Sequence, residues 1–221
     1  MKATQRLQQL HDKPGSNDTK GENGQPSANE APLAQSSAQA SAQGASQESS
    51  ELQLDEAAIE RAKTGLDEGA VTPSYGPWRE SIVKLLNDAL ATELVCVLRY
   101  KRHYFTASGM DSPRVAEEFL EHAHEEEAHG DKLAERIVQL GGEPDFAPGG
   151  LLARSHADYD ESTDLKSMVR ANLVAERVAV ETYRQMIALI GDKDPTTRRL
   201  LEEILHDEEE HADELKDLLG L

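Results

Sequence analysis

The chain has 221 residues and a formal net charge of −19 at pH 7, with 23 basic against 42 acidic side chains. Such an acidic surface repels nucleic acid and anionic lipid, so neither is expected as a partner. The single cysteine excludes an internal disulfide and a four-cysteine metal site, and no segment approaches the roughly 20 apolar residues of a membrane span. Because the N-terminus also lacks the apolar run of a secretory signal, we expect a soluble cytoplasmic protein.

Residues 1–76 are predicted to be a disordered extension. Up to about residue 51 they consist mainly of Gly, Ser, Ala, Gln and Asn, with few large apolar side chains. Such a segment buries too little apolar surface to offset its ordering entropy. A short helix over residues 55–66 is the one element expected there. The composition leaves open whether the extension is a tether, a partner-binding tail or a filling of a cage.

Residues 77–221 are predicted to form one domain, beginning with two long helices. The first helix runs over about 77–108 and stops at a glycine. Ser112 is expected as the N-cap of the second helix, with Pro113 at its first helical position. The glycines at 141 and 142 end this helix.

A loop over about 143–162, rich in Gly, Pro and Asp, then leads to two further helices. The third helix starts near Thr163 and ends at Gly191, and the pair Asp194 and Pro195 opens the fourth. No segment alternates with a period of two, so no strand is expected. The prediction is an all-α four-helix bundle with one long crossover between helices two and three, which is the connectivity of ferritin-like folds.

Each predicted helix carries a glutamate in the middle of its inward stripe. Positions three and four residues apart share a helix face, and on the fourth helix such positions read Leu, Ile, Glu, His, Leu, Leu. A similar Glu-x-x-His pair interrupts the stripe of the second helix, and single glutamates interrupt the other two. The interrupting residues are Glu93, Glu126, His129, Glu176, Glu208 and His211.

Four buried carboxylates that face one another repel strongly unless they are protonated or bridged by cations. Divalent ions resolve this conflict. Glutamate oxygens and neutral histidine nitrogens form a mixed donor set that suits iron or manganese, whereas thiolate ligands are absent.

A lone Glu-x-x-His pair in an acidic helix is more often solvated surface than a metal site, but here the pattern is repeated. The two halves of the domain resemble copies of one helical hairpin with their polar residues at matching depth. Glu126 and His129 recur 82 residues later as Glu208 and His211, and Glu93 and Tyr100 recur 83 residues later as Glu176 and Tyr183. The repetition favours the metal site.

These residues resemble the ferritin-like superfamily, and within it the bacterioferritins most closely, over roughly residues 78–218. The segments that carry the resemblance are Asn87 to Glu93 with Tyr100, Glu126 to Asp131 with Glu135 to Ile137, Leu173 to Glu176, and Asp207 to His211. The resemblance implies a di-iron ferroxidase that oxidises Fe(II) with O2 or H2O2 in iron detoxification or storage.

The resemblance also implies roles for single residues, with two iron ions per subunit and manganese as an alternative metal. Glu93, Glu126 and His129 would hold one ion, Glu176, Glu208 and His211 would hold the other, and Glu126 and Glu208 would bridge them. Tyr100, also assigned to the catalytic set, and Tyr183 would hydrogen-bond near the ligands or supply a further electron. Each tyrosine alone fits an ordinary core position equally well.

The sequence departs from the bacterioferritin pattern in two places. Haem binding is not carried over, because Glu127 stands where bacterioferritins have the haem-ligating methionine. The chain ends ten residues after His211, which leaves no room for the fifth helix of large cages. A homo-oligomer between a dimer and a twelve-subunit cage is therefore expected, and iron oxidation is more strongly implied than iron storage.

Four further residues have open interpretations. His122 lies on the inner face one turn before Glu126 and fits either a hydrogen-bonded core histidine or a role in iron entry. His124 and His206 point off the stripe and are expected at the surface or an interface. Cys96 is expected to be a small core residue.

Three other functions remain as alternatives. A rubrerythrin-like peroxidase would use the same bundle, although its usual electron-transfer domain needs four cysteines. A DNA-protecting mini-ferritin would share the chemistry, but it usually places its iron between subunits and grips DNA with a basic tail. A non-catalytic acidic helical scaffold would bind no stoichiometric metal.

Overall fold

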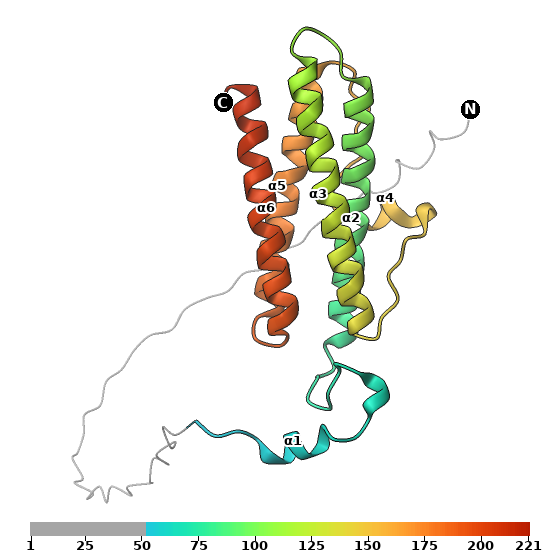
Figure 1. Ribbon diagram of the computed structural model, residues 1–221, viewed down its shortest axis with the longest axis vertical. Helices are drawn as coiled ribbons and strands as arrows, with labels where there is room; N and C mark the ends of the chain where they lie inside the picture. Colours follow the sequence, from blue (N-terminus) through green and yellow to red (C-terminus); the bar gives the residue numbers. More distant parts are fainter. Residues whose placement is uncertain (1–51) are drawn as a thin grey trace, which may run out of the picture. The chain divides into compact units, whose positions relative to one another are not determined.

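The computed structural model describes residues 52–221, so the disorder predicted for residues 1–51 lies outside the described residues. The described part is helical and contains no strand, which confirms the predicted fold class. Figure 1 shows four long helices side by side. They are α2 (Arg79–Thr106), α3 (Ser112–Gln139), α5 (Leu165–Ile190) and α6 (Pro195–Leu219); the shorter elements are α1 (Glu56–Arg61), α4 (Leu151–Arg154) and 3-10 turns at Leu66–Glu68 and Pro148–Gly150.

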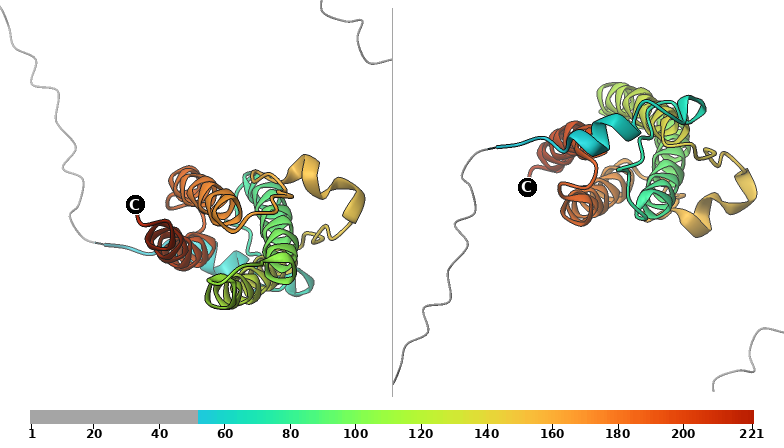
Figure 2. Two further views of the ribbon diagram at one scale, coloured as in Figure 1. Left: turned by 90° about the horizontal axis from the view of Figure 1, so that it is seen from above. Right: turned by 90° about the horizontal axis from the view of Figure 1, so that it is seen from below.

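The long helices are arranged as two hairpins. α2 packs mainly against α3, and α5 packs mainly against α6, while contacts of α2 with α5 and of α3 with α6 join the two pairs. The end-on views in Figure 2 show the four helices around a common axis. The apolar stripe of each helix therefore faces the other three helices, as the spacing of the apolar residues predicts.

The long crossover between α3 and α5 is confirmed. It contains α4, which packs on the outer side of α2, where Leu151 contacts the buried Ala91 and Val95 (Figure 1). The crossover thereby covers the middle of α2, and the interior of the bundle is left to the four long helices.

The predicted helix starts are confirmed for α6 and wrong for α3. The Asp194 side chain accepts a hydrogen bond from the Thr197 main-chain N–H at 3.0 Å and caps α6. In α3, Ser112 is already helical, and the N-cap position is Asp111, whose side chain makes no capping hydrogen bond. The Ser112 hydroxyl instead donates back to the Gly109 carbonyl at 2.8 Å, so it is not free to cap the helix.

Two apolar clusters fill the two ends of the bundle interior. One contains Leu90, Leu133, Tyr183 and Ile204 among its fully buried members. The other is built around Tyr100, Phe119 and Met168 at the opposite end. The polar stripe residues lie between these clusters, so the site has a dry core on each side along the bundle axis.

The segment before α2 contacts the bundle through Tyr75. Its hydroxyl accepts a hydrogen bond from Arg136 of α3 at 2.7 Å, and Val71 is buried nearby in the sequence. The domain boundary at residue 76 stays a prediction. Among the described residues, no helix is both long enough and apolar enough to cross a membrane.

Candidate metal centre

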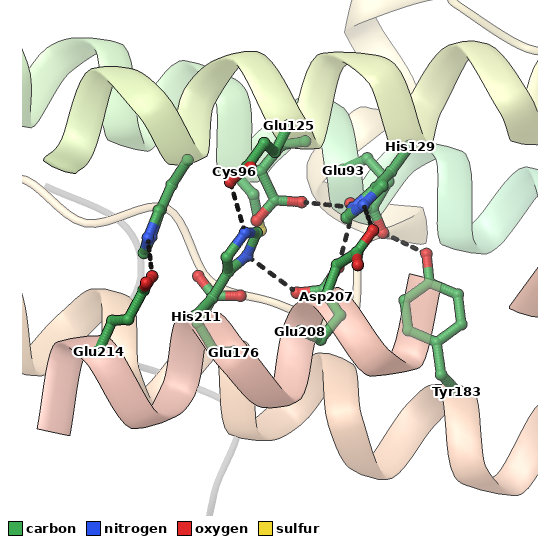
Figure 3. Close-up of polar contacts among 12 residues, drawn as sticks. Glu93, Cys96, Glu125, His129, Glu176, Tyr183, Asp207, Glu208, His211 and Glu214 are labelled. Carbon is green, nitrogen blue, oxygen red and sulfur yellow. Dashed lines mark hydrogen bonds and ion pairs between the residues drawn. The ribbon is translucent and has the colours of Figure 1, made fainter. Parts of the chain in front are cut away.

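The six polar stripe residues converge in the middle of the bundle, and each is at most 3% exposed. Their ligand atoms form two overlapping groups, each with all atoms within 4.8 Å of one another. Figure 3 shows several of these side chains pointing toward one another between the helices. The first group is Glu93, Glu126, His129 and Glu208, and the second is Glu126, Glu176, Glu208 and His211.

Glu126 and Glu208 belong to both groups, which is the geometry required of two carboxylates that bridge a pair of ions. The Nδ1 atom of His129 lies 3.2 Å from a Glu208 oxygen and 3.8 Å from an oxygen of Glu93. The Nδ1 atom of His211 lies 3.8 Å from the other Glu208 oxygen. Both imidazoles thus turn the same ring nitrogen toward the carboxylates.

The convergent atoms lack hydrogen-bond partners within the protein. Buried side-chain atoms without a partner are rare in folded proteins, and each costs free energy. Here eight such atoms gather in one place: both oxygens of Glu126 and of Glu208, Oε2 of Glu93 and of Glu176, and Nδ1 of His129 and of His211. A set of acceptor atoms that face one another without donors is a cation site in its chemistry.

The outward nitrogen of each histidine is held by a carboxylate from the opposite hairpin. His129 of α3 donates its Nε2–H to Asp207 of α6 at 3.1 Å. His211 of α6 donates its Nε2–H to Glu125 of α3 at 2.8 Å. Both contacts are drawn in Figure 3. Each carboxylate fixes the ring orientation and leaves a lone pair on Nδ1, as metal-binding histidines require.

Sequence reasoning did not single out Asp207 and Glu125. The signal was present, because both residues directly precede the glutamate of a Glu-x-x-His pair and they are themselves 82 residues apart. In a chain with 42 acidic residues, one more carboxylate beside each motif does not stand out.

The two tyrosines bond across the bundle. Tyr100 of α2 donates its hydroxyl to Glu176 of α5, and Tyr183 of α5 donates to Glu93 of α2. Each tyrosine therefore holds the terminal glutamate of the other hairpin. The hydrogen-bonding role suggested for Tyr100 and Tyr183 has its geometry here, and burial raises the pKa of both hydroxyls, so both remain donors.

Without a cation, protons take its place in the centre. Burial raises the pKa of Glu126 and of Glu176 well above the ordinary value, and the charge of Glu208 raises both further. Burial would also raise the pKa of Glu208, but hydrogen bonds from His129 and His211 hold it well below its usual value. Burial works to lower the histidine pKa values, yet the carboxylates outweigh it and bring the pKa of His211 to about 9.

One end of the centre is lined by a buried polar network. Arg99 is fully buried, lies 3.9 Å from an oxygen of Glu176, and donates to the Asn172 side chain at 2.7 Å. His103 extends the network, with its Nδ1 atom 3.2 Å from the Asn172 amide. Sequence reasoning missed Arg99, because an arginine in an amphipathic helix usually indicates the solvent face.

The remaining predicted residues lie as follows. His122 is buried, with Nδ1 at 3.1 Å from the Tyr100 hydroxyl and Nε2 at 3.0 Å from Glu214, so it is a hydrogen-bonded histidine. His124 and His206 are exposed. Cys96 is buried in the core, and burial raises the pKa of its thiol well above the usual value.

These residues fit a pair of divalent cations. Four carboxylates and two imidazole nitrogens form a donor set of the kind that iron and manganese bind. The partnerless oxygens and Nδ1 atoms face the space between the helices, and no lysine or arginine among the described residues bonds to them.

The fold and the centre together define a four-helix bundle of the dinuclear carboxylate class. The ferritin-like domain family matches residues 83–221, and the chain belongs to this family. A bacterioferritin of Brucella melitensis is 32% identical over 143 residues, which are 63% of this chain and 83% of the relative. A DNA protection during starvation protein of Pyrococcus furiosus is 31% identical over 143 residues, which are 63% of this chain and 77% of the relative.

A solved structure gives the same result at the level of the fold. The dodecameric thioferritin of Bacteroides fragilis, described as bacterioferritin-related, is 32% identical with a TM-score of 0.62. The match covers 64% of this chain and 86% of that one. The resemblance to ferritin-like proteins and bacterioferritins that the motifs predict is thereby confirmed.

Proposed function

We propose that the protein is a ferroxidase that binds two Fe(II) ions in the middle of the bundle and oxidises them with O2 or H2O2. The observation that carries this proposal is the group of eight buried acceptor atoms without partners, contributed by four glutamates and two histidines. Membership of the ferritin-like family supports the choice of iron.

Each hairpin contributes three of the six proposed ligands. Glu93 and His129 hold one ion, Glu176 and His211 hold the other, and Glu126 and Glu208 contact both. All six are proposed as the catalytic and metal-binding set. Two bound ferrous ions supply one electron each to an oxidant held between them. The protein's part is to hold the ligands in place, and the apolar clusters on both sides keep bulk water away.

The surrounding residues position the ligands and manage protons. Asp207 and Glu125 keep the Nδ1 atoms of His129 and His211 free of hydrogen. Because Glu126 and Glu176 hold protons when no cation is present, cation binding releases protons, and metal affinity rises with pH. Tyr100 is included in the catalytic set because its hydroxyl holds Glu176.

The proposal extends to assembly and to the other metals. A homo-oligomeric cage fits the likeness to the dodecameric thioferritin of Bacteroides fragilis. Manganese would be bound by the same donor set. Haem is not part of the proposal, because Glu127 stands at the methionine position and is exposed. A cytoplasmic location fits this reading.

The non-catalytic scaffold is the less favoured alternative, because a scaffold has no use for four carboxylates at the centre of its core. A rubrerythrin-like peroxidase would use the same ligands, and it differs in what it does with the electrons. The test is therefore designed to separate binding, oxidation and choice of oxidant.

The experiment is an anaerobic Fe(II) titration followed by separate additions of O2 and H2O2, with the ferric product followed by absorbance. Two ferrous ions per chain are expected to be oxidised together in the fast phase. In the double variant Glu126→Gln and Glu208→Gln, the fast phase should fall by more than about 100-fold, since even residues that only support metal ligands contribute 10–100-fold.

The matched control is Glu127→Gln with Glu209→Gln, which changes the charge equally at the next position of each helix, where both side chains are exposed. The control should oxidise iron like the unaltered protein. No stoichiometric iron binding would overturn the ferroxidase in favour of the scaffold. Binding of two ions with fast turnover of peroxide, but without accumulation of ferric product, would favour the peroxidase.

A further inference from the structure

A second group of metal-binding side chains lies beside the centre, between α3 and α6. Glu118, His122 and Glu214 each offer one ligand atom, and these atoms lie within 4.8 Å of one another. His122 Nε2 is 3.0 Å from a Glu214 oxygen and 3.9 Å from a Glu118 oxygen. Ligands at about 2.1 Å from a metal ion lie roughly 3 to 4.2 Å apart, so the group needs only a small adjustment.

The group combines a buried imidazole with two carboxylates that solvent reaches. The His122 side chain is 1% exposed, whereas Glu118 and Glu214 are 27% and 45% exposed. The ring of His122 stacks on that of His211 with centroids 4.1 Å apart. The group therefore lies on the solvent side of the proposed ligand His211, in contact with it.

Hydrogen-bond bookkeeping shows that this group is short of a donor. When Glu176 is ionised, as a metal ligand must be, the Tyr100 hydroxyl donates its only proton to it. The Tyr100 oxygen then accepts the Nδ1–H of His122 at 3.1 Å. A neutral imidazole has one N–H, so Nε2 of His122 carries a lone pair that faces the Glu214 carboxylate. Two acceptors 3.0 Å apart require a cation between them.

The neutral form of His122 is the one that burial favours. Removal from water lowers the pKa of His122 to about 3, and the nearby His211 lowers it further. The two carboxylates are in turn crowded by negative charge. Burial raises the pKa of Glu118 and of Glu214, and neighbouring glutamates add to this effect.

The other half of the internal repeat serves as a built-in comparison. At the positions equivalent to Glu118, His122 and Glu214 the chain has Leu200, Ile204 and Lys132. None of these three can bind a cation. The polar group is therefore a feature of one side of the centre only, and the general acidity of the chain does not account for it.

We propose that Glu118, His122 and Glu214 form a third divalent-cation site next to the dinuclear centre. The proposal rests on the proposed function, because the ionised Glu176 sets the proton position of His122. It goes beyond that function, since none of the three residues belongs to the dinuclear set. A mixed site of one imidazole and two carboxylates suits the same class of ion, a first-row divalent metal.

The test is an anaerobic titration with Co(II), whose visible absorption reports each bound ion. The unaltered protein is expected to bind three ions per chain. The double variant Glu118→Gln with Glu214→Gln should bind two. The matched control, Glu117→Gln with Asp213→Asn, makes the same charge change one residue away on each helix, at exposed positions outside the group. It should still bind three, and circular dichroism checks that both variants fold.

The outcomes separate this inference from the proposed function. Two ions in both the unaltered protein and the Glu118→Gln, Glu214→Gln variant would overturn the third site and leave the dinuclear centre intact. Three ions in that variant, or two in the control, would also overturn it, since the third ion would then lie elsewhere or reflect surface charge. A single ion that disappears in the variant would keep this site and remove the dinuclear one.

Discussion

The α2 and α3 hairpin and the α5 and α6 hairpin carry the same ligands, and each completes the site of the other. Every supporting contact crosses between them. Tyr100 holds Glu176 while Tyr183 holds Glu93, and the outer carboxylate of each histidine comes from the opposite hairpin. Neither hairpin alone has a complete set of partners, so the centre exists only when the two hairpins pack together.

The hairpins differ where their chemistry is not shared. Arg99 and His122 in the first hairpin correspond to Thr182 and Ile204 in the second. One side of the centre therefore borders on a polar network, and the other side borders on the apolar cluster that contains Ile204. The ligand set has kept its two-fold repetition, while the surroundings of the two ions have become unequal.

The starts of α3 and α6 give the comparison with the largest expected effect. Asp194 caps α6 and also bonds to Arg136 of α3 through both carboxylate oxygens at 2.9 and 3.0 Å. Its counterpart region in α3, at Asp111, has no capping contact. Asp194→Ala leaves Arg136 buried without its partner and is expected to cost about 3–5 kcal/mol. Asp111→Ala should change stability by less than about 0.5 kcal/mol.

Urea unfolding of the metal-free variants, followed by circular dichroism, measures both values. Asp194→Asn serves as an intermediate, because it keeps an acceptor for the Thr197 N–H but removes the charge. Equal effects at positions 111 and 194 would show that the Arg136 contact does not join the hairpins.

The same contact predicts an acid-dependent loss of stability. Burial opposes ionisation of Asp194, but hydrogen bonds from Thr197 and Arg136 outweigh it and lower the pKa of Asp194 below its ordinary value. A depressed pKa in the folded state gives stability that is present above the unfolded pKa, near 3.9, and is lost as pH falls through the folded pKa. Unfolding free energies from pH 5 down to pH 2 should fall less steeply for Asp194→Asn than for the unaltered protein. Parallel curves would contradict this prediction.

The outer carboxylates allow each ion to be perturbed separately. Asp207→Asn should weaken the ion at Glu93 and His129, and Glu125→Gln should weaken the ion at Glu176 and His211, each by about 10–100-fold in affinity. The reason is that the imidazole loses the acceptor that fixes its orientation.

Anaerobic Co(II) titration gives the two affinities, and the shifted N–H proton resonances of the bound imidazoles assign them. Each variant should alter the resonance of its own histidine only. Glu209→Gln, an exposed neighbour of the motif, is the control and should leave both affinities unchanged. If Asp207→Asn and Glu125→Gln weakened the same ion, the crossed arrangement would be wrong.

The bundle and the convergence of its polar residues were predictable, because both follow from spacing along single helices. Leucines and glutamates at every third and fourth position define a face, and the repeat fixes the depth at which Glu93, Glu126, Glu176 and Glu208 lie. The assignment of these residues to metal ions remains a prediction that metal titration tests.

The remaining features depend on contacts between helices, which spacing does not encode. Tyr100 could have bonded to Glu93 on its own helix, and only the packed bundle shows that it reaches Glu176. Arg99 is read as a surface residue until the crossover and α5 cover it, where the Asp158 carbonyl and Asn172 accept its hydrogen bonds. The Ser112 cap failed because its hydroxyl had a nearer acceptor in the preceding turn.

The smallest expected effect comes from the residue that follows each histidine. Gly130 follows His129, and Ala212 follows His211 at the equivalent position. A Cβ atom added at Gly130 would lie 3.5 Å from Leu90 Cδ1 and 3.8 Å from Glu93 Cβ, which are ordinary packing distances. Since glycine inside a helix is less favourable than alanine by about 0.5–1 kcal/mol, Gly130→Ala should stabilise the fold by about that amount, and Ala212→Gly should cost a similar amount. Chemical denaturation of both variants and of the double exchange measures this, while metal stoichiometry should not change; destabilisation by Gly130→Ala would mean that α2 and α3 need the bare backbone beside the centre, and the hairpins would then differ in packing as well as in charge.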